Sequence, residues 1–507
     1  MLNTVNRAHQ LDILECIANL STNEVATAPS IANKILDTLP LDVWSNPDLR
    51  WLDPGTKTGV FLREAAKRLL AGLADVIPDE DARRKHIYTH MLFGFPITEL
   101  TGQISRRTLY YTKDASQPNQ SVVEFDSPEG NIPFVRFEHT YKGSSTNCSI
   151  CGAKKGVLDR GQDKDNHAYS FIHDKEVHSM RFDVIVGNPP YQLGDGGGGK
   201  GTSAKPIYHL FVNQAFKLKP KYVAMIIPSR WFSGGKGLDD FREKMLTSTK
   251  FRKLVDYTDA KEVFPGTQIK GGVCYFLWDS QYDGPCEIVR IQNGEIGTSV
   301  KRHLNAHGKV FIRFNEAAPI LERVLDKSGE FLSNQVTSRN AFNILSNFSD
   351  YKDSKFDGAI EFYCVDGVKW IPRESINRNV GLIDRWKTLI PKAGPGNDGY
   401  PHKILGEPLV AGPGSVCSET YLVVGDYETE QEAKNMQSFL RTRFARFMIA
   451  LVKNTQNLTK SGFEFTPKLP IDSNWTDEKL FAYYGIGLEE QEFINTIVKP
   501  MAGPENV

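Results

Sequence analysis

The sequence predicts an α/β fold, a doubly wound parallel sheet followed by a C-terminal α+β domain. Residues 182–187 (FDVIVG) and 222–228 (YVAMIIP) are apolar, rich in β-branched side chains and bounded by turn residues, as expected for strands buried on both faces. Residues 52–62 indicate a strand end, a glycine-containing turn and the start of a helix. Strands that alternate with helices are typical of a doubly wound sheet.

The chain is expected to form two domains, because 507 residues exceed the size of one ordinary domain. Further strands are expected near 108–112 and at 272–277. Beyond these the hydrophobic periodicity weakens and Pro/Gly turns become frequent. We therefore expect a first domain at 1–285, interrupted by a polar insertion at about 114–170, and a second domain at 286–507.

Composition restricts the class of protein. Hydrophobic residues at 40% and charged residues at 24% are the fractions of a soluble globular protein. The 61 basic and 61 acidic residues balance, so a DNA-binding surface would have to be a local patch. Because no apolar run reaches membrane-spanning length and the N-terminus lacks a signal-peptide core, no membrane association is expected. Seven cysteines are too few for a disulfide framework, which favours the reducing cytoplasm.

The strand at 182–187 ends in the tetrapeptide Asn188, Pro189, Pro190 and Tyr191. Two prolines fix φ and cannot continue a strand ladder, so the chain leaves the sheet in a rigid turn. Ligands of open α/β sheets bind at the carboxyl ends of strands. There the Asn188 oxygen and a turn carbonyl would accept hydrogen bonds from an amino group while the Tyr191 ring stacks on a planar substrate.

This NPPY tetrapeptide resembles motif IV of the S-adenosylmethionine-dependent amino methyltransferases. Most members of that group modify N6 of adenine in DNA, although methylases of release-factor glutamine and ribosomal RNA guanine carry the motif too. The resemblance implies a Rossmann-like methyltransferase sheet with S-adenosylmethionine as cofactor. It also assigns the catalytic role to Asn188, Pro189, Pro190 and Tyr191.

A turn of small residues, 53–59 (DPGTKTG), follows the first strand and would bring backbone close to a ligand. It resembles motif I of the adenine methylases, which holds the methionine end of the cofactor. Lys57 stands where glycine is common, and either pairs with the cofactor carboxylate or is a solvated surface lysine. The cofactor contacts implied by the resemblance are Asp53, Pro54, Gly55, Thr56, Lys57, Thr58, Gly59 and Phe61.

Three weaker motifs complete the predicted cofactor site. Thr27 and Pro29 precede a helix and resemble motif X, which approaches the methionine moiety; an ordinary helix cap is the alternative. Residues 94–99 resemble motif II, whose acidic side chain accepts from the ribose hydroxyls, and Glu99 is the expected acid. Asp174 fits the strand-end acid of motif III that reaches the cofactor adenine; the alternative is a surface Asp at a turn.

Cys148 and Cys151 form a Cys-x-x-Cys pair followed by glycine, the turn that lets two thiolates meet one zinc ion. His139 and His167 flank the pair within the insertion, so they are the first choices for the other two ligands. An insertion with little core would be stabilised by the metal. Two free thiols are the alternative. The remaining histidine candidates are His173 and His178.

Two further segments suggest contacts with nucleic acid. The glycine-rich loop at 194–201, with Lys200 and Lys205 nearby, would order over an extruded base or serve as a plain connector. A helix is expected at 429–453, with aromatic residues on the core side and basic residues facing DNA phosphates or solvent. The residues of this helix that carry the pattern are Phe439, Arg441, Arg443, Phe444, Arg446, Phe447 and Lys453.

The order of the motifs (X, I, II, III, IV, then a long C-terminal region) resembles the gamma group of amino methyltransferases. Residues 387–393, 417–421 and 465–468 resemble markers of the single-chain adenine methylases of bacterial restriction–modification systems. The resemblance implies adenine-N6 methylation of flipped bases in double-stranded DNA and a C-terminal target-recognition domain. Some relatives fuse a nuclease domain, but no acid-acid-x-Lys nuclease cluster stands out in this sequence, so cleavage is expected from a separate restriction endonuclease and not from this chain. The alternatives are an RNA or protein-glutamine methyltransferase and a non-catalytic recognition subunit.

Overall fold

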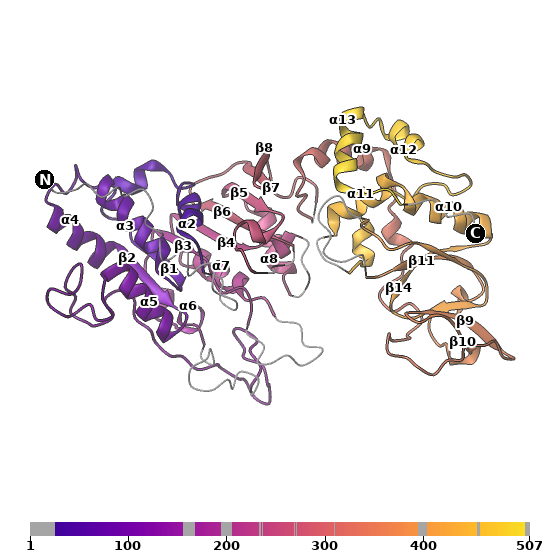
Figure 1. Ribbon diagram of the computed structural model, residues 1–507, viewed down its shortest axis with the longest axis horizontal. Helices are drawn as coiled ribbons and strands as arrows, with labels where there is room; N and C mark the ends of the chain where they lie inside the picture. Colours follow the sequence, from indigo (N-terminus) through magenta and orange to yellow (C-terminus); the bar gives the residue numbers. More distant parts are fainter. Residues whose placement is uncertain are drawn as a thin grey trace, which may run out of the picture. The chain divides into compact units, whose positions relative to one another are not determined.

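The computed structural model describes residues 26–155, 168–193, 205–232, 235, 237–267, 269, 271–308, 310–393, 403–453 and 457–501. The chain divides into two compact units, Met1–Ala306 and His307–Val507. A large central sheet with helices forms the first unit, which confirms the mixed α/β architecture expected from the sequence (Figure 1).

Within the described residues, eight strands build the sheet of the first unit. They are β1 (Trp51–Thr56), β2 (Leu92–Pro96), β3 (Val184–Gly187), β4 (Tyr222–Pro228), β5 (Phe251–Tyr257), β6 (Val273–Asp279), β7 (Cys286–Gln292) and β8 (Glu295–Arg302). Their order is β2-β1-β3-β4-β6-β5-β7-β8. β1 pairs in parallel with β2 and β3, and β3 pairs in parallel with β4. β6 runs antiparallel between β4 and β5, so the sheet is mixed. The prediction of a purely parallel sheet is therefore wrong.

The central strands are buried on both faces. Every residue of β3, β4 and β6 is buried. Val184 and Val186 belong to one core cluster, whereas Ile185 points to the opposite face and is equally buried. Continuous apolar runs therefore predicted these strands correctly, because neither face needs polar side chains.

The helices of the first unit begin and end at local signals. The side chain of Thr98 accepts a hydrogen bond from the Thr101 N–H and starts the helix that ends at Tyr110, where Tyr111 has φ +69°. The prediction of a strand near 108–112 is therefore wrong. The helices are α2 (Pro29–Leu36), α3 (Val60–Gly72), α4 (Glu80–His86), α5 (Glu99–Tyr110), α6 (Ser170–His173), α7 (Tyr208–Lys217) and α8 (Asp239–Thr247).

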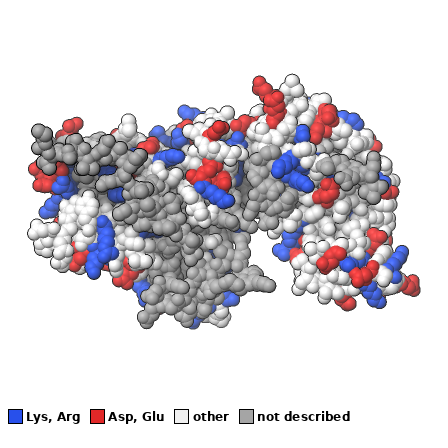
Figure 2. Space-filling view, in the orientation of Figure 1, with Lys and Arg blue, Asp and Glu red and all other residues white. Residues whose placement is uncertain are grey.

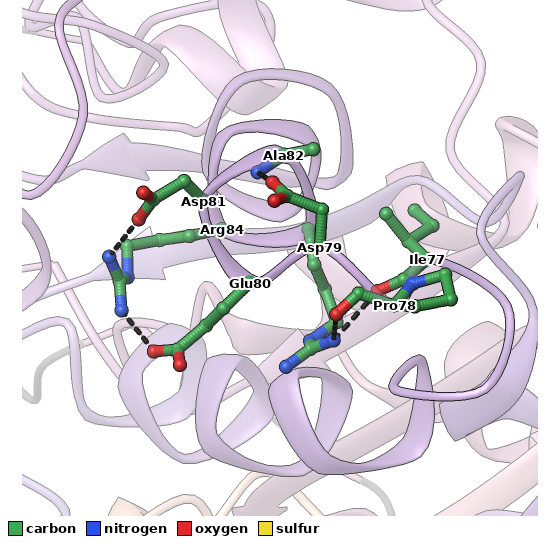
Figure 3. Close-up of polar contacts among 8 residues, drawn as sticks. Ile77, Pro78, Asp79, Glu80, Asp81, Ala82 and Arg84 are labelled. Atoms are coloured by element: carbon green, nitrogen blue, oxygen red, sulfur yellow. Dashed lines mark hydrogen bonds and ion pairs between the residues drawn. The ribbon is translucent and has the colours of Figure 1, made fainter.

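Figure 3 shows the polar contacts at the start of α4. The Asp79 carboxylate accepts from the Ala82 N–H at 2.7 Å. Arg84 forms ion pairs with two acidic side chains one turn earlier in the helix. These exposed contacts stabilise the helix locally by tenths of a kcal/mol each, roughly, and carry no chemistry.

The first unit extends further along the chain than expected. β7 pairs in parallel with β5, and β8 pairs antiparallel with β7. Both strands had been expected in the second domain, yet they lengthen the first sheet as far as Arg302. The division consequently follows Ala306 rather than residue 285.

Two three-stranded sheets and a group of helices are described in the second unit. One sheet has the order β10-β9-β13 and the other β12-β11-β14. The strands are β9 (Ala359–Cys364), β10 (Gly367–Pro372), β11 (Trp386–Pro391), β12 (Leu409–Ala411), β13 (Ser415–Cys417) and β14 (Tyr421–Tyr427). The helices are α9 (Ala318–Lys327), α10 (Glu430–Arg441), α11 (Arg443–Val452), α12 (Asp477–Tyr484) and α13 (Leu488–Ile497).

The single helix expected at 429–453 is divided into α10 and α11. Thr442 has an extended backbone with ψ 149°, and its hydroxyl accepts from the Ala445 N–H. It therefore ends one helix and caps the next. Phe439, Phe444 and Phe447 are buried in the core of this unit, as predicted.

The basic side chains of these helices are held by the unit itself. Buried Arg446 donates to the carbonyl oxygen of Lys499 at 2.6 Å, and Lys453 donates to that of Ile404 at 2.6 Å. Burial lowers the pKa of Lys453 to about 8. The expectation that these two residues face DNA phosphates is therefore wrong. The other two basic residues, Arg441 and Arg443, contact Glu407 and Asn495. Figure 2 shows basic and acidic side chains intermixed on the visible face.

Candidate active site

Residues from three separate segments line one pocket of the first unit. The turn after β1 and the residue after β3 meet because these strands are parallel neighbours, whose carboxyl ends lie at the same edge of the sheet. A residue from the segment before α2 joins them. The lining residues are Thr27, Asp53, Gly55, Lys57, Thr58, Gly59, Val60, Phe61 and Asn188. The pocket thus brings together Thr27 of motif X, six of the eight residues predicted from motif I and Asn188 of motif IV. Its lining does not include the other predicted residues, Pro29, Pro54, Thr56, Pro189, Pro190 and Tyr191.

The Asn188 side chain is held in one orientation. It is buried, and its Nδ2 donates to Thr27 Oγ1 at 3.1 Å. With the nitrogen directed at Thr27, the acceptor oxygen lies on the other side of the amide. Thr27 does not cap α2, whose N-cap is Ala28 without a side-chain hydrogen bond. The alternative of an ordinary cap at Thr27 is therefore wrong, and its hydroxyl positions Asn188.

Replacing Thr27 with valine removes the hydroxyl and keeps the size of the side chain. We expect the rate of the methyl transfer predicted from the tetrapeptide to fall about fivefold, because one buried hydrogen bond contributes about 1 kcal/mol and its loss frees the amide to rotate. Single-turnover methylation assays would measure the rate. Thr27→Ser retains the hydroxyl and should restore most of it; equal rates for both variants would contradict the positioning role.

The end of β1 lies directly against the tetrapeptide. A Cβ atom at Gly55 would lie 3.2 Å from Pro190 Cδ and 3.4 Å from Pro189 Cα. A Cβ atom at Gly187 would lie 2.7 Å from Asp53 Oδ1. The two strand ends therefore approach each other closely only because glycine stands at both positions.

Asp53 is the acidic group of this pocket. It is buried, and its Oδ1 accepts from the Gly55 N–H at 3.2 Å. Burial raises the pKa of Asp53 to about 7, although the Gly55 N–H and the Lys57 charge act in the opposite direction. The carboxyl is therefore poised to change charge near neutral pH.

This pKa predicts a pH-dependent affinity for a cationic ligand. Well below pH 7 the Asp53 carboxyl is protonated and gives no charge attraction, so affinity for the predicted cofactor S-adenosylmethionine should rise with pH through about 7 and level off about one pH unit higher. Calorimetric titrations between pH 5.5 and 8.5 would measure this. Asp53→Asn should bind more weakly at high pH and show a flat profile; an unchanged slope in that variant would contradict the assignment.

Tyr191 and Lys57 lie together beside Asn188. The Lys57 Nζ is 5.9 Å from the centroid of the Tyr191 ring, and the Phe264 ring is 6.3 Å from it at a steep angle. The Tyr191 ring is half-buried, and burial of its hydroxyl raises the tyrosine pKa well above the ordinary value. Lys57 is partly buried and lines the pocket, and its pairing with the cofactor carboxylate stays a prediction.

Comparison with known proteins identifies the family. Residues 90–264, which contain the Asn188 tetrapeptide, match the family model of the Eco57I restriction-modification methylases. A Mycoplasma pneumoniae protein described as an adenine-specific methylase is 40% identical over 303 residues, covering 55% of this chain and 72% of that protein. The chain belongs to the adenine-specific methylases. Among solved structures, the Type IIL restriction-modification enzyme MmeI in complex with DNA is similar in fold, with a TM-score of 0.50 at 12% identity over 87% of this chain and 67% of that one.

The two remaining acids predicted for the cofactor lie outside the pocket lining of the methylase. Glu99 is the exposed first residue of α5, and its contact with a ribose stays a prediction. Asp174 follows α6 rather than a strand, and its Oδ1 accepts from the Glu176 N–H at 2.8 Å. Its assignment as a strand-end acid is therefore wrong, since the local turn uses this carboxylate.

The insertion and the end of α6 bring four potential metal ligands together. His139, Cys148, Cys151 and His173 place one ligand atom each within 4.8 Å of one another. His167, a first choice from the sequence, lies outside the described residues, as do the glycine-rich loop at 194–201 and Lys200. None of the described helices of the methylase is long and apolar enough to cross a membrane.

Sequence reasoning missed two relations in this region. Thr27 was predicted to approach the cofactor, not to orient Asn188, which is 161 residues away. His173 was a secondary candidate because it follows the insertion. No local pattern signals either pairing, since both depend on how distant segments pack.

Proposed function

We propose that the methylase is a site-specific DNA methyltransferase that transfers a methyl group from S-adenosylmethionine to N6 of adenine. It would form the modification part of a restriction–modification or phage-defence system. The observation that supports this most strongly is that buried Asn188 shares a pocket with the turn at 53–59. An acceptor for an amino group and a cradle for a cofactor must face one space for direct transfer between them.

The chemistry of the pocket suits the proposed cofactor. The Asp53 carboxylate would attract the cationic methionine end, and Lys57 would pair with its carboxylate. Gly55 and Gly59 leave backbone exposed to the ligand. Glu99 is the proposed partner of the ribose hydroxyls. S-adenosylmethionine supplies an electrophilic methyl group when bound.

The tetrapeptide would prepare the amino group of the target base. The Asn188 Oδ1 and the Pro189 carbonyl oxygen accept its two hydrogens, which directs the nitrogen lone pair toward the methyl group. Tyr191 stacks on the base and fixes its plane. Rate enhancement comes from positioning and from these oriented dipoles, without a covalent intermediate.

The amino group of adenine is inaccessible inside a stacked duplex, so the base must be flipped out. Double-stranded DNA is therefore the proposed partner, and the unit at 307–507 is proposed to read the target. Cleavage is assigned to a separate endonuclease, and the cytoplasm is the proposed location. A structural zinc ion at the Cys/His cluster completes the proposal.

A transfer assay with radiolabelled S-adenosylmethionine tests the function. Duplex DNA, RNA and protein are offered in parallel, and label is expected in DNA alone, as N6-methyladenine after digestion. Label in RNA or protein would favour the alternative methyltransferases, and N4-methylcytosine would contradict the base assignment. Failure to bind the cofactor would indicate a non-catalytic recognition subunit. Single-molecule sequencing of DNA from expressing cells would give the target site.

A further inference from the structure

The Cys-x-x-Cys segment forms a tight hairpin. Tyr141 and Cys148 form an isolated antiparallel β-bridge, and the Cys148 N–H donates to the Ala153 carbonyl at 2.8 Å. Gly152, with φ +74°, closes the turn and donates to the Cys148 carbonyl at 2.9 Å. The backbone of Cys151 also hydrogen-bonds to the Cys148 thiol. This geometry brings the two sulfurs of the Cys-x-x-Cys turn close together, as a shared metal ion requires.

Two histidines from outside the hairpin complete a four-ligand set. The Cys151 Sγ lies 3.3 Å from His139 Nδ1, and the Cys148 Sγ lies 3.8 Å from His173 Nε2. Zinc bonds of about 2.3 Å to sulfur and about 2.05 Å to nitrogen place adjacent S and N ligands about 3.6 Å apart in a tetrahedron. Both observed distances are close to that separation.

The orientation of His173 also suits a ligand. Its Nδ1 lies 3.0 Å from the carbonyl oxygen of Tyr169, which accepts the ring N–H. The lone pair is thereby left on Nε2, the atom that faces Cys148. A backbone carbonyl that fixes the tautomer in this way is the usual outer partner of a metal-bound histidine. Two thiolates and two imidazoles favour zinc over magnesium or calcium.

The cluster is connected to the tetrapeptide through described contacts. The α6 helix, which ends at His173, packs on α7, where the Phe171 and Phe211 rings stack at 5.7 Å. On the hairpin side, a Cβ atom at Gly152 would lie 3.9 Å from Lys205 Nζ. Lys205 in turn accepts through its carbonyl oxygen from the Leu193 N–H at 3.0 Å.

These contacts reach the residue that would stack on the base. The Ile207 N–H donates to the Tyr191 carbonyl at 3.1 Å, and Gln192 and Pro206 form an isolated antiparallel β-bridge. The hairpin therefore approaches Lys205, and α6 packs on α7, which follows the stem formed by the paired segments 191–193 and 205–207. Four ligands on one ion would hold these two supports together.

We propose that His139, Cys148, Cys151 and His173 bind one structural Zn²⁺ ion that clamps the insertion onto α6 and so holds the stem after Tyr191 in place. The ion takes no part in the reaction. The expected effect of the zinc ion on methyl transfer rests on the proposed function. The presence of the ion and the identity of its ligands do not.

Metal content of the purified full-length protein tests the site first. Mass spectrometry of metals should find about one zinc per chain, falling below about 0.2 in Cys148→Ser and His173→Ala. His178→Ala is the matched control, because His178 is exposed and outside the cluster, and it should keep its zinc. A wild-type protein without metal would overturn the proposal. Zinc lost in His167→Ala but retained in His173→Ala would overturn the ligand assignment.

Cobalt substitution tests the metal site in the wild-type protein, so its result does not depend on whether a variant folds. Wild-type protein loaded with Co²⁺ should show the intense visible bands of a tetrahedral site and a thiolate-to-cobalt charge-transfer band. His173→Cys should rebind the metal with a stronger charge-transfer band, because a third thiolate replaces nitrogen. An octahedral spectrum in the wild type would contradict the four-ligand assignment.

The clamp is tested separately from the site. Removing zinc by chelation should lower the rate of methyl transfer at least about tenfold, leave the dissociation constant for S-adenosylmethionine within about twofold, and be reversed by added Zn²⁺. If removing zinc from the protein leaves the transfer rate unchanged, the proposal that the ion holds the stem in place is wrong. Zinc-bound protein that methylates no DNA at all would instead contradict the proposed function.

Discussion

Replacing Asn188 with alanine is expected to reduce methyl transfer about 10²–10³-fold, the usual effect of removing one preorganised hydrogen-bonding group from an active site. The variant loses the amide oxygen that would accept from the target amine. It also loses the Nδ2 contact with Thr27. The cofactor should still bind, because the turn at 53–59 supplies most of the pocket lining. Single-turnover rates and calorimetric affinities would separate the two effects.

Two further variants sharpen this experiment. Asn188→Asp keeps an acceptor oxygen but cannot donate to Thr27 and adds a negative charge, so it should also be impaired. Asn213→Ala is the matched control, since the Asn213 side chain makes an exposed contact with Lys244. Full activity in Asn188→Ala, or equal loss of cofactor affinity and rate, would contradict the assigned role.

Replacing Gly59 with alanine is expected to lower the free energy of unfolding by about 2–4 kcal/mol and to abolish measurable cofactor binding. Gly59 has φ +73° at the start of α3, a conformation that costs an L-residue about 1–2 kcal/mol. A Cβ atom there would also lie 3.0 Å from the Ser105 carbonyl oxygen and 3.1 Å from its Cα, backbone atoms of α5 that cannot move alone. Relieving this contact would shift α3 and open the turn that lines the pocket.

Gly294→Ala is the matched control for that variant. Gly294 has φ +76° but has no other atom within 4 Å of the added Cβ, so it should show only the backbone cost of about 1–2 kcal/mol. Urea unfolding and cofactor titration would be measured for both full-length variants. Equal destabilisation at the two positions, with cofactor affinity retained at Gly59→Ala, would contradict the packing argument.

The elements that the sequence predicted well are those with strong local signals. β4 occupies residues 222–228 as expected, because a continuous apolar run can only be a buried segment. The turns after β1 and β3 were placed correctly by their glycine and proline residues. Their meeting in one pocket follows from the rule that parallel strands end at the same edge of the sheet.

The errors arose where long-range packing decides. Residues 286–302 were assigned to the second domain because hydrophobic periodicity weakens there, yet they form the β7–β8 hairpin, which joins the first sheet by pairing with β5. One amphipathic run became two helices, because Thr442 provides a cap that periodicity does not reveal. Arg446 looked like a phosphate contact but is buried among backbone carbonyls. The residue type shows that a side chain is charged, but only the fold shows which group it contacts.

By itself, the sequence determined the local features of the proposed site of this methylase: Asn188 at the end of one buried strand and a glycine-containing turn at the end of another. Local residue types suffice for this, since prolines, glycines and apolar runs constrain the nearby backbone directly. The tertiary structure alone decided which distant side chains orient and support that chemistry. Thr27 reaches Asn188, and His173 reaches Cys148, because folding brings together segments whose separation along the chain carries no local signal.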